Sequence, residues 1–132
     1  METQTLVLSG GRKVVVAPFT ITVDFELIRP FVVLLPAANA ADCSLAEEIL
    51  ASLIQRGCIE LCCVGAFAEQ MHDQLDATIE RLGDLNVATT WFDDKSDACE
   101  YFLFAAGGGS SSLLALIMTQ PDLVDILINT SQ

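Results

Sequence analysis

The sequence predicts an α/β fold, a three-layer Rossmann-like sandwich in which helices cover both faces of a mostly parallel sheet of about four strands. Short apolar segments alternate with amphipathic segments of about 10 to 15 residues. The apolar segments are nearly continuous, which is typical of parallel strands buried on both faces. Glycine and proline stand at many of the boundaries between them, as they do at helix ends and loops.

Residues 1–28 are predicted to form a β segment at the edge of the sheet. Two apolar, β-branched segments, 5–9 and 14–17, flank a glycine-containing turn and indicate an antiparallel hairpin. Apolar and polar residues then alternate from Thr20 to Leu27. This alternation predicts a further strand with one buried and one solvent-exposed face.

The core of βα repeats is expected over residues 30–130. Phe31 to Leu35 is an apolar run between two prolines and is interpreted as the first parallel strand. Ser44 and Glu47 have the spacing of a capping box, so the first helix is expected to begin near Ser44, and its apolar stripe stops at Gly57.

Three further strand–helix units complete the expected order β-α-β-α-β-α-β-α, which implies right-handed crossovers. The strands are expected at 58–65, 87–92 and 113–119, and the helices at 67–82, at 96–106 and from Pro121 onward. No linker or internal repeat is visible, so residues 1–132 are expected to form a single α/β domain.

The charge balance excludes two classes of partner. The chain has 6 Lys+Arg against 18 Asp+Glu, a formal net charge of −12, which repels phosphate backbones and anionic membranes. We therefore expect no nucleic acid and no membrane partner, and no apolar run reaches the length of a membrane span. The acidic residues concentrate between Asp42 and Glu100, which favours a basic protein partner or a divalent cation. A solvated acidic surface is the alternative.

The apolar content and the cysteines bear on the oligomeric state and the location of the protein. Hydrophobic residues make up 52% of the sequence, which either fills a large core or leaves an apolar patch for a second copy. We expect a homo-oligomer, a dimer. The five cysteines, with Cys62 next to Cys63, suit reduced core thiols better than disulfides. The N-terminus lacks a secretory signal, so a cytoplasmic location is expected.

A candidate crevice lies at the carboxyl ends of the parallel strands, where ligands bind in open α/β sheets. The polar and aromatic residues expected there are Asn39, Asp42, Glu69, His72, Trp91, Asp93 and Asp94. Their carboxylates suit Mg²⁺, but Asp94 and Asp97 also have the spacing of a helix N-cap, which needs no metal. Trp91 is expected in the core rather than on a ligand. We assign no metal and no cofactor.

A candidate interaction face runs along the helix expected at 67–82. At 100° per residue its polar side collects Glu69, His72, Asp73, Asp76 and Glu80. Glu69 and His72 have the Glu-x-x-His spacing of di-metal sites, but the chain contains no second histidine. A surface imidazolium favoured by neighbouring carboxylates is the preferred interpretation.

Other catalytic and cofactor-binding motifs are absent from the sequence or have unsuitable spacing. Cys62 and Cys63 are adjacent on a strand and point to opposite faces, so they cannot both reach one zinc ion without a bulge. A Gly-x-Ser-x-Gly elbow is absent, as are the glycine-rich loops that bind dinucleotides and nucleoside triphosphates. Gly107 to Gly109 precede a strand rather than follow one.

Two segments, GCIELCCVGAFAEQMHDQLDATIERLG and VATTWFDDKSDACEYFLFAA, resemble an uncharacterised family of small bacterial α/β proteins. In that family a strand ending in glycine precedes a helix with a His-Asp pair and then a Thr-Thr-Trp strand. The matching positions here are Gly65, His72, Asp73, Thr89, Thr90 and Trp91. The resemblance covers the middle half of the chain, and it implies the fold and a bacterial cytoplasmic origin but no activity.

Together these features predict a non-catalytic binding or interaction domain, of an immunity or regulatory type, that engages a basic surface. The alternative is a small-molecule or divalent-metal-dependent enzyme with its site in the carboxyl-end crevice. A purely structural subunit is a third possibility.

Overall fold

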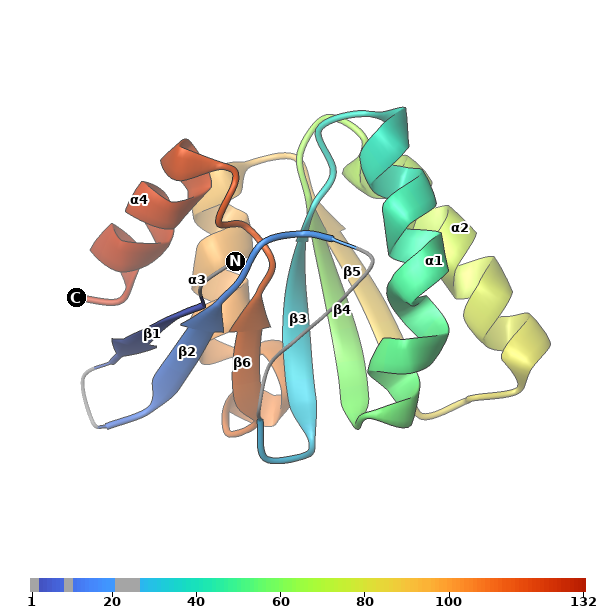
Figure 1. Cartoon of the computed structure of the whole chain (residues 1–132), viewed down its shortest axis with the longest axis horizontal. Coiled ribbons are helices and arrows are strands. Elements are labelled where there is room, and N and C mark those ends of the chain that lie inside the picture. Colours follow the sequence, from blue (N-terminus) through green and yellow to red (C-terminus); the bar gives the residue numbers. More distant parts are fainter. Residues whose placement is uncertain (1–2, 9–10, 21–26) are drawn as a thin grey trace.

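A computed structural model describes residues 3–8, 11–20 and 27–132 (Figure 1). Its strands are β1 (Gln4–Val7), β2 (Lys13–Val16), β3 (Phe31–Pro36), β4 (Cys58–Val64), β5 (Ala88–Phe92) and β6 (Ser112–Ala115). Its helices are α1 (Ala40–Gln55), α2 (Ala68–Leu82), α3 (Lys95–Phe104) and α4 (Pro121–Thr130), with a short 3₁₀ helix, η1 (Ala106–Gly109).

The strands form one six-stranded sheet in the order β1-β2-β6-β3-β4-β5. β2, β6, β3, β4 and β5 are mutually parallel, and only β1 runs antiparallel, against β2. The mostly parallel sheet and its N-terminal hairpin edge are thus confirmed. The strand expected from Thr20 to Leu27 falls largely on residues 21–26, which lie outside the described residues.

Helices cover both faces of the sheet, giving three layers (Figure 1). On one face α1 and α2 pack against side chains that include Val33, Leu35 and Cys63. On the other face α3 and α4 pack against Val32 and Cys62, among others. Adjacent strand residues therefore enter different cores, because successive side chains of a strand point to opposite faces.

Three expected boundaries were wrong. α1 begins at Ala40, not near Ser44, because Asn39 caps the helix by accepting a hydrogen bond from the Asp42 amide at 2.9 Å. Asn39 and Ser44 are both residue types that can cap a helix, and the structure uses Asn39. α3 ends at Phe104, before the glycine-rich η1. β6 ends at Ala115 because the chain turns ahead of α4, where the Gln120 amide donates to the Ile117 carbonyl at 2.8 Å.

Gly65 closes the carboxyl end of β4 in a backbone conformation that only glycine adopts easily. Its φ is +129°, and a Cβ added there would lie 2.7 Å from the Ala37 carbonyl oxygen. Neither backbone segment can easily move away, because the Gly65 amide donates to the Phe92 carbonyl at 3.0 Å and the Ala37 carbonyl accepts from the Phe67 amide at 2.8 Å. The glycine therefore lets the β3, β4 and β5 ends approach one another.

Replacing Gly65 with alanine is expected to lower the free energy of unfolding by about 2–3 kcal/mol, because backbone strain and a steric clash add. Urea denaturation followed by circular dichroism measures this. Gly83→Ala is the matched control, since Gly83 also has positive φ but nothing lies within 4 Å of its added Cβ. We expect a loss of only about 1 kcal/mol for the control, and equal losses in the two variants would contradict the clash.

Candidate functional site

The polar residues at the carboxyl ends of the strands mainly cap helices. Asn39 caps α1, and the carboxylate of Asp42 accepts from the Ala38 amide at 2.9 Å. Asp94 caps α3 by accepting from the Asp97 amide at 2.8 Å. These oxygens satisfy amides that a helix N-terminus leaves without partners, so they are engaged locally rather than aimed at a shared ligand.

The remaining members of the expected crevice do not assemble a metal centre. Glu69 and Asp93 are exposed, and His72 is half-buried beside Asp73. In the part of the chain that the structure describes, no three His, Cys, Asp or Glu side chains lie close enough together to hold a metal ion. The polar residues at this end of the sheet therefore contribute negative charge and helix caps.

Trp91 is not in the core, and the expectation that it would be was wrong. Its side chain is 40% exposed. The reason is the position of β5, which pairs only with β4 in the described sheet and therefore forms its edge. The alternation of a strand predicts which way a side chain points, but only the strand order decides whether anything covers it.

The outer side of α2 presents the acidic residues that the helical periodicity placed together. Met71, Leu75 and Ile79 are buried on the inner side. Asp73, Asp76 and Glu80, together with Glu69, are exposed on the outer side. His72 Nδ1 lies 3.0 Å from a carboxylate oxygen of Asp73, so the one histidine joins this surface.

The acidic side of α2 continues onto the edge strand β5. The Thr89 hydroxyl donates to the Asp76 carboxylate at 3.4 Å, which links the helix to the strand. Thr89 and Trp91 pair in register with Leu61 and Cys63, which belong to the core under α1 and α2. Paired residues of parallel strands share a face, so Trp91 lies on the α2 side of the sheet. We call Asp73, Asp76, Glu80 and Trp91 the acidic edge.

Glu60 is a buried carboxylate whose importance the sequence analysis missed. It is 7% exposed, and its oxygens accept from Tyr101 Oη at 2.6 Å, from the Gly107 amide at 3.0 Å and from Thr90 Oγ1 at 3.2 Å. Burial and the hydrogen bond to Glu60 both raise the pKa of Tyr101. A lone acidic residue inside an otherwise apolar strand was the available signal, because a buried carboxylate needs donors.

All five cysteines are free and buried. Burial raises the pKa of Cys58 and Cys63 to about 12 and that of Cys99 to about 11. A thiol must ionise to act as a nucleophile, so these side chains serve as apolar core residues. Cys62 and Cys63 lie in opposite cores, as the strand geometry predicted.

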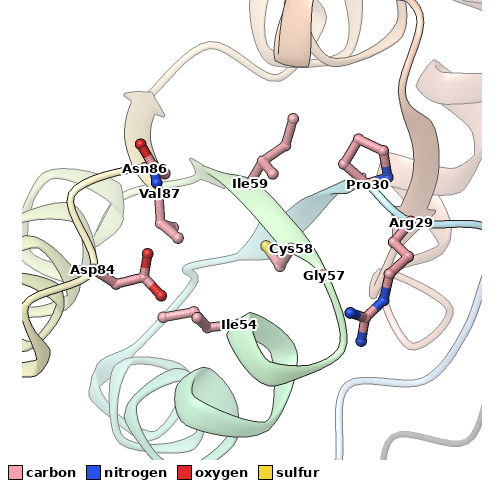
Figure 2. Close-up of a pocket in the computed structure, with 9 residues that line it drawn as sticks. All are labelled: Arg29, Pro30, Ile54, Gly57, Cys58, Ile59, Asp84, Asn86 and Val87. Carbon is pink, nitrogen blue, oxygen red and sulfur yellow. The ribbon is translucent and has the colours of Figure 1, made fainter.

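A cavity of about 350 Å³ opens at the amino ends of β3, β4 and β5, opposite the end where the sequence analysis expected a site (Figure 2). Figure 2 shows Arg29 and Asp84 on opposite sides of it, with Cys58 between them. The other lining residues are Pro30, Ile54, Gly57, Ile59, Asn86 and Val87. The lining residues come from three segments that are distant in the chain, so no local motif predicted the cavity.

The lining of the cavity is mostly apolar, with Arg29, Asp84 and Asn86 as its main polar members. It contains no histidine, serine or threonine, and the Cys58 thiol is held protonated by burial. Arg29 is engaged in the fold, because one guanidinium nitrogen donates to the Gln55 carbonyl at 2.9 Å, near the end of α1. Gly57 admits this arrangement, since a Cβ there would lie 2.6 Å from the Cβ of Arg29.

The fold and the surfaces together define a mostly parallel α/β sandwich with an acidic helical face beside an open sheet edge. Within the residues described, no helix combines the length and apolar character needed to cross a membrane. The chain belongs to the family described as Domain of unknown function (DUF7684), whose model matches residues 15–124. Comparison with curated proteins gave no match, and comparison with solved structures gave none either.

Proposed function

We propose that this protein is a non-catalytic binding domain that engages a basic protein partner through the acidic edge. The observation that carries the proposal is the junction of α2 and β5, where the exposed carboxylate of Asp76 contacts Thr89, two residues before the exposed Trp91 on the same face of the strand. Tryptophan is enriched among the residues that dominate binding energy, and surrounding charges steer the partner and select its sign.

The charge distribution supports a basic partner. The net charge of −12 attracts cations over several ångströms, and a local cluster of carboxylates focuses that attraction. Arg81 is the one lysine or arginine of α2, and its guanidinium donates to Thr78 near the end of the helix. Asp73 and Asp76 are therefore free of a lysine or arginine partner among the described residues.

We further propose that the domain acts in a bacterial cytoplasm as an immunity-type or regulatory protein, and that it self-associates through apolar surface away from the acidic edge. The exposed side chains of Val7, Ile28 and Phe104 support such a surface. Light scattering measures the molar mass of the protein in solution. A monomer mass at high concentration would contradict the proposed dimer.

Reversing two charges of the acidic edge is expected to abolish partner binding. The double variant Asp73→Lys and Asp76→Lys replaces attraction with repulsion, so affinity for the captured partner should fall by about 100-fold or more and lose its salt dependence. The wild-type protein, immobilised, first captures the partner from a native extract, and titration calorimetry with the purified partner at low and high salt then measures both changes.

The matched control is Glu48→Lys with Asp125→Lys. Both residues are exposed, on α1 and α4, and the control changes the net charge by the same amount. It should retain binding within a few-fold, because long-range attraction is screened over about 8 Å at physiological salt. Equal losses in both double variants would show that only net charge matters, and undiminished binding of the first would rule the acidic edge out.

A further inference from the structure

We propose that the basic partner binds as an extended strand on the free edge of β5, adding a seventh strand to the sheet and placing a cationic side chain over Trp91. This inference rests on the proposed function and specifies how the acidic edge holds its partner. Strand addition supplies affinity through main-chain hydrogen bonds and specificity through alternate side chains.

The edge of β5 has backbone groups available for pairing. The carbonyl of Phe92 accepts from the Gly65 amide at 3.0 Å, so the backbone groups of Phe92 face β4. Because these groups alternate along a parallel strand, the N–H and C=O of Thr89 and Trp91 face the open side. No other strand pairs with β5 within residues 27–132, and Ala88 and Trp91 are exposed.

The chemistry around β5 selects a basic strand. Asp76 lies over the strand through its contact with Thr89, and the exposed Asp93 and Asp94 follow its carboxyl end. An incoming segment with arginine or lysine at alternate positions would place those side chains on the α2 side, beside Asp73 and Asp76. An arginine there can also stack on the Trp91 ring.

The same charges argue against a second copy of this chain at β5. Two molecules that each carry −12 would bring their acidic edges together, and flanking charge is a known means of preventing edge-to-edge pairing. The opposite edge of the sheet differs in sign, because β1 pairs with β2, which begins at Lys13 directly after Arg12. A basic strand is therefore directed to β5 rather than to β1.

The test uses a labelled synthetic peptide of alternating arginine and valine and the same peptide with N-methylated backbone amides. Fluorescence anisotropy gives the affinity, and Trp91, the single tryptophan of the chain, reports contact through its own emission. We expect the unmodified peptide to bind and to change the Trp91 emission. N-methylation should weaken binding by at least about tenfold, because it removes the donors that pair with β5 while the charge is unchanged.

Two protein variants separate strand addition from charge attraction. Thr89→Pro deletes an amide that faces the open edge, where proline is tolerated, and should weaken the unmodified peptide by about tenfold. The second variant carries the Asp73→Lys and Asp76→Lys reversals, which leave the β5 backbone intact and should abolish binding of both peptides. The N-methylated peptide tests the same pairing on the wild-type protein, so the inference stays testable if the Thr89 variant fails to fold. Circular dichroism checks both variants.

The outcomes are distinguishable. If Thr89→Pro and the N-methylated peptide both bind like their parents, while the Asp73 and Asp76 reversals abolish binding, strand addition is wrong and the acidic edge stands. If the reversals bind the peptide unchanged, the proposed function fails. A wild-type protein that binds neither peptide, or whose β5 edge is occupied by a second copy in a concentration-dependent dimer, also overturns the inference.

Discussion

The protein is expected to unfold in mild alkali, between about pH 9 and pH 10.5. The cause is the set of buried thiols. Burial raises the pKa of Cys58 and Cys63 to about 12 and of Cys99 to about 11, and it raises the pKa of Cys62 as well. In the unfolded chain the same thiols titrate near 9.0.

The direction of the effect follows from proton counting. Above pH 9 the unfolded chain has released these protons, whereas the folded chain still holds them, so the unfolded state binds fewer protons. The free energy of unfolding therefore falls as pH rises, by about 1.4 kcal/mol per pH unit for each thiol. Four thiols together remove about 5 kcal/mol by pH 10, which is comparable with the whole stability of a small domain.

Urea denaturation at pH 7.5, 9 and 10 measures this loss, with a reducing agent present throughout. A variant with Cys62→Ala and Cys63→Ala is less stable at neutral pH because it loses core volume, but its stability should fall only about half as steeply with pH. A free energy of unfolding that is the same at pH 7.5 and pH 10 would contradict the prediction.

Replacing Glu60 with alanine is expected to lower the free energy of unfolding by about 4 kcal/mol. The carboxylate holds three elements to β4, because it accepts from Tyr101 of α3, Thr90 of β5 and the Gly107 amide of η1. Its removal leaves these donors without their partner in a largely buried place and opens a space beside Cys62. Unsatisfied buried donors cost more than the hydrogen bonds themselves contribute.

Chemical denaturation of matched variants measures the contribution of Glu60. Glu80→Ala, on the exposed side of α2, is the control and should change stability by less than about 0.5 kcal/mol. Tyr101→Phe removes only the 2.6 Å hydrogen bond and should cost about 1.5–2 kcal/mol. If Glu60→Ala were no more destabilising than Glu80→Ala, the network would have no structural role.

Several features followed from local sequence alone. Neighbouring residues predict three of these features: the apolar strand β3 between two prolines, the end of α2 at Gly83, and the hairpin of β1 and β2. The acidic side of α2 also followed, because a helical repeat of 3.6 residues sorts side chains onto faces without reference to the rest of the molecule. These properties depend on spacing, and spacing is visible in the chain.

Other features depended on which segments meet in space. β6, the last strand in the chain, inserts between β2 and β3, and this leaves β5 at the edge and Trp91 exposed. Glu60 finds its donors up to 47 residues away, and the cavity at the amino ends joins three parts of the chain.

The sequence by itself thus determined the class of fold, the face of each element on which a side chain lies, and the sign of the surface charge. Each of these depends on residue types and on spacings of a few residues. Only the tertiary structure decided the strand order, and with it the exposure of Trp91, the partners of Glu60 and the open edge of β5. Several strand orders satisfy the same local pattern, and long-range packing selects one of them. The local pattern therefore cannot predict the strand order.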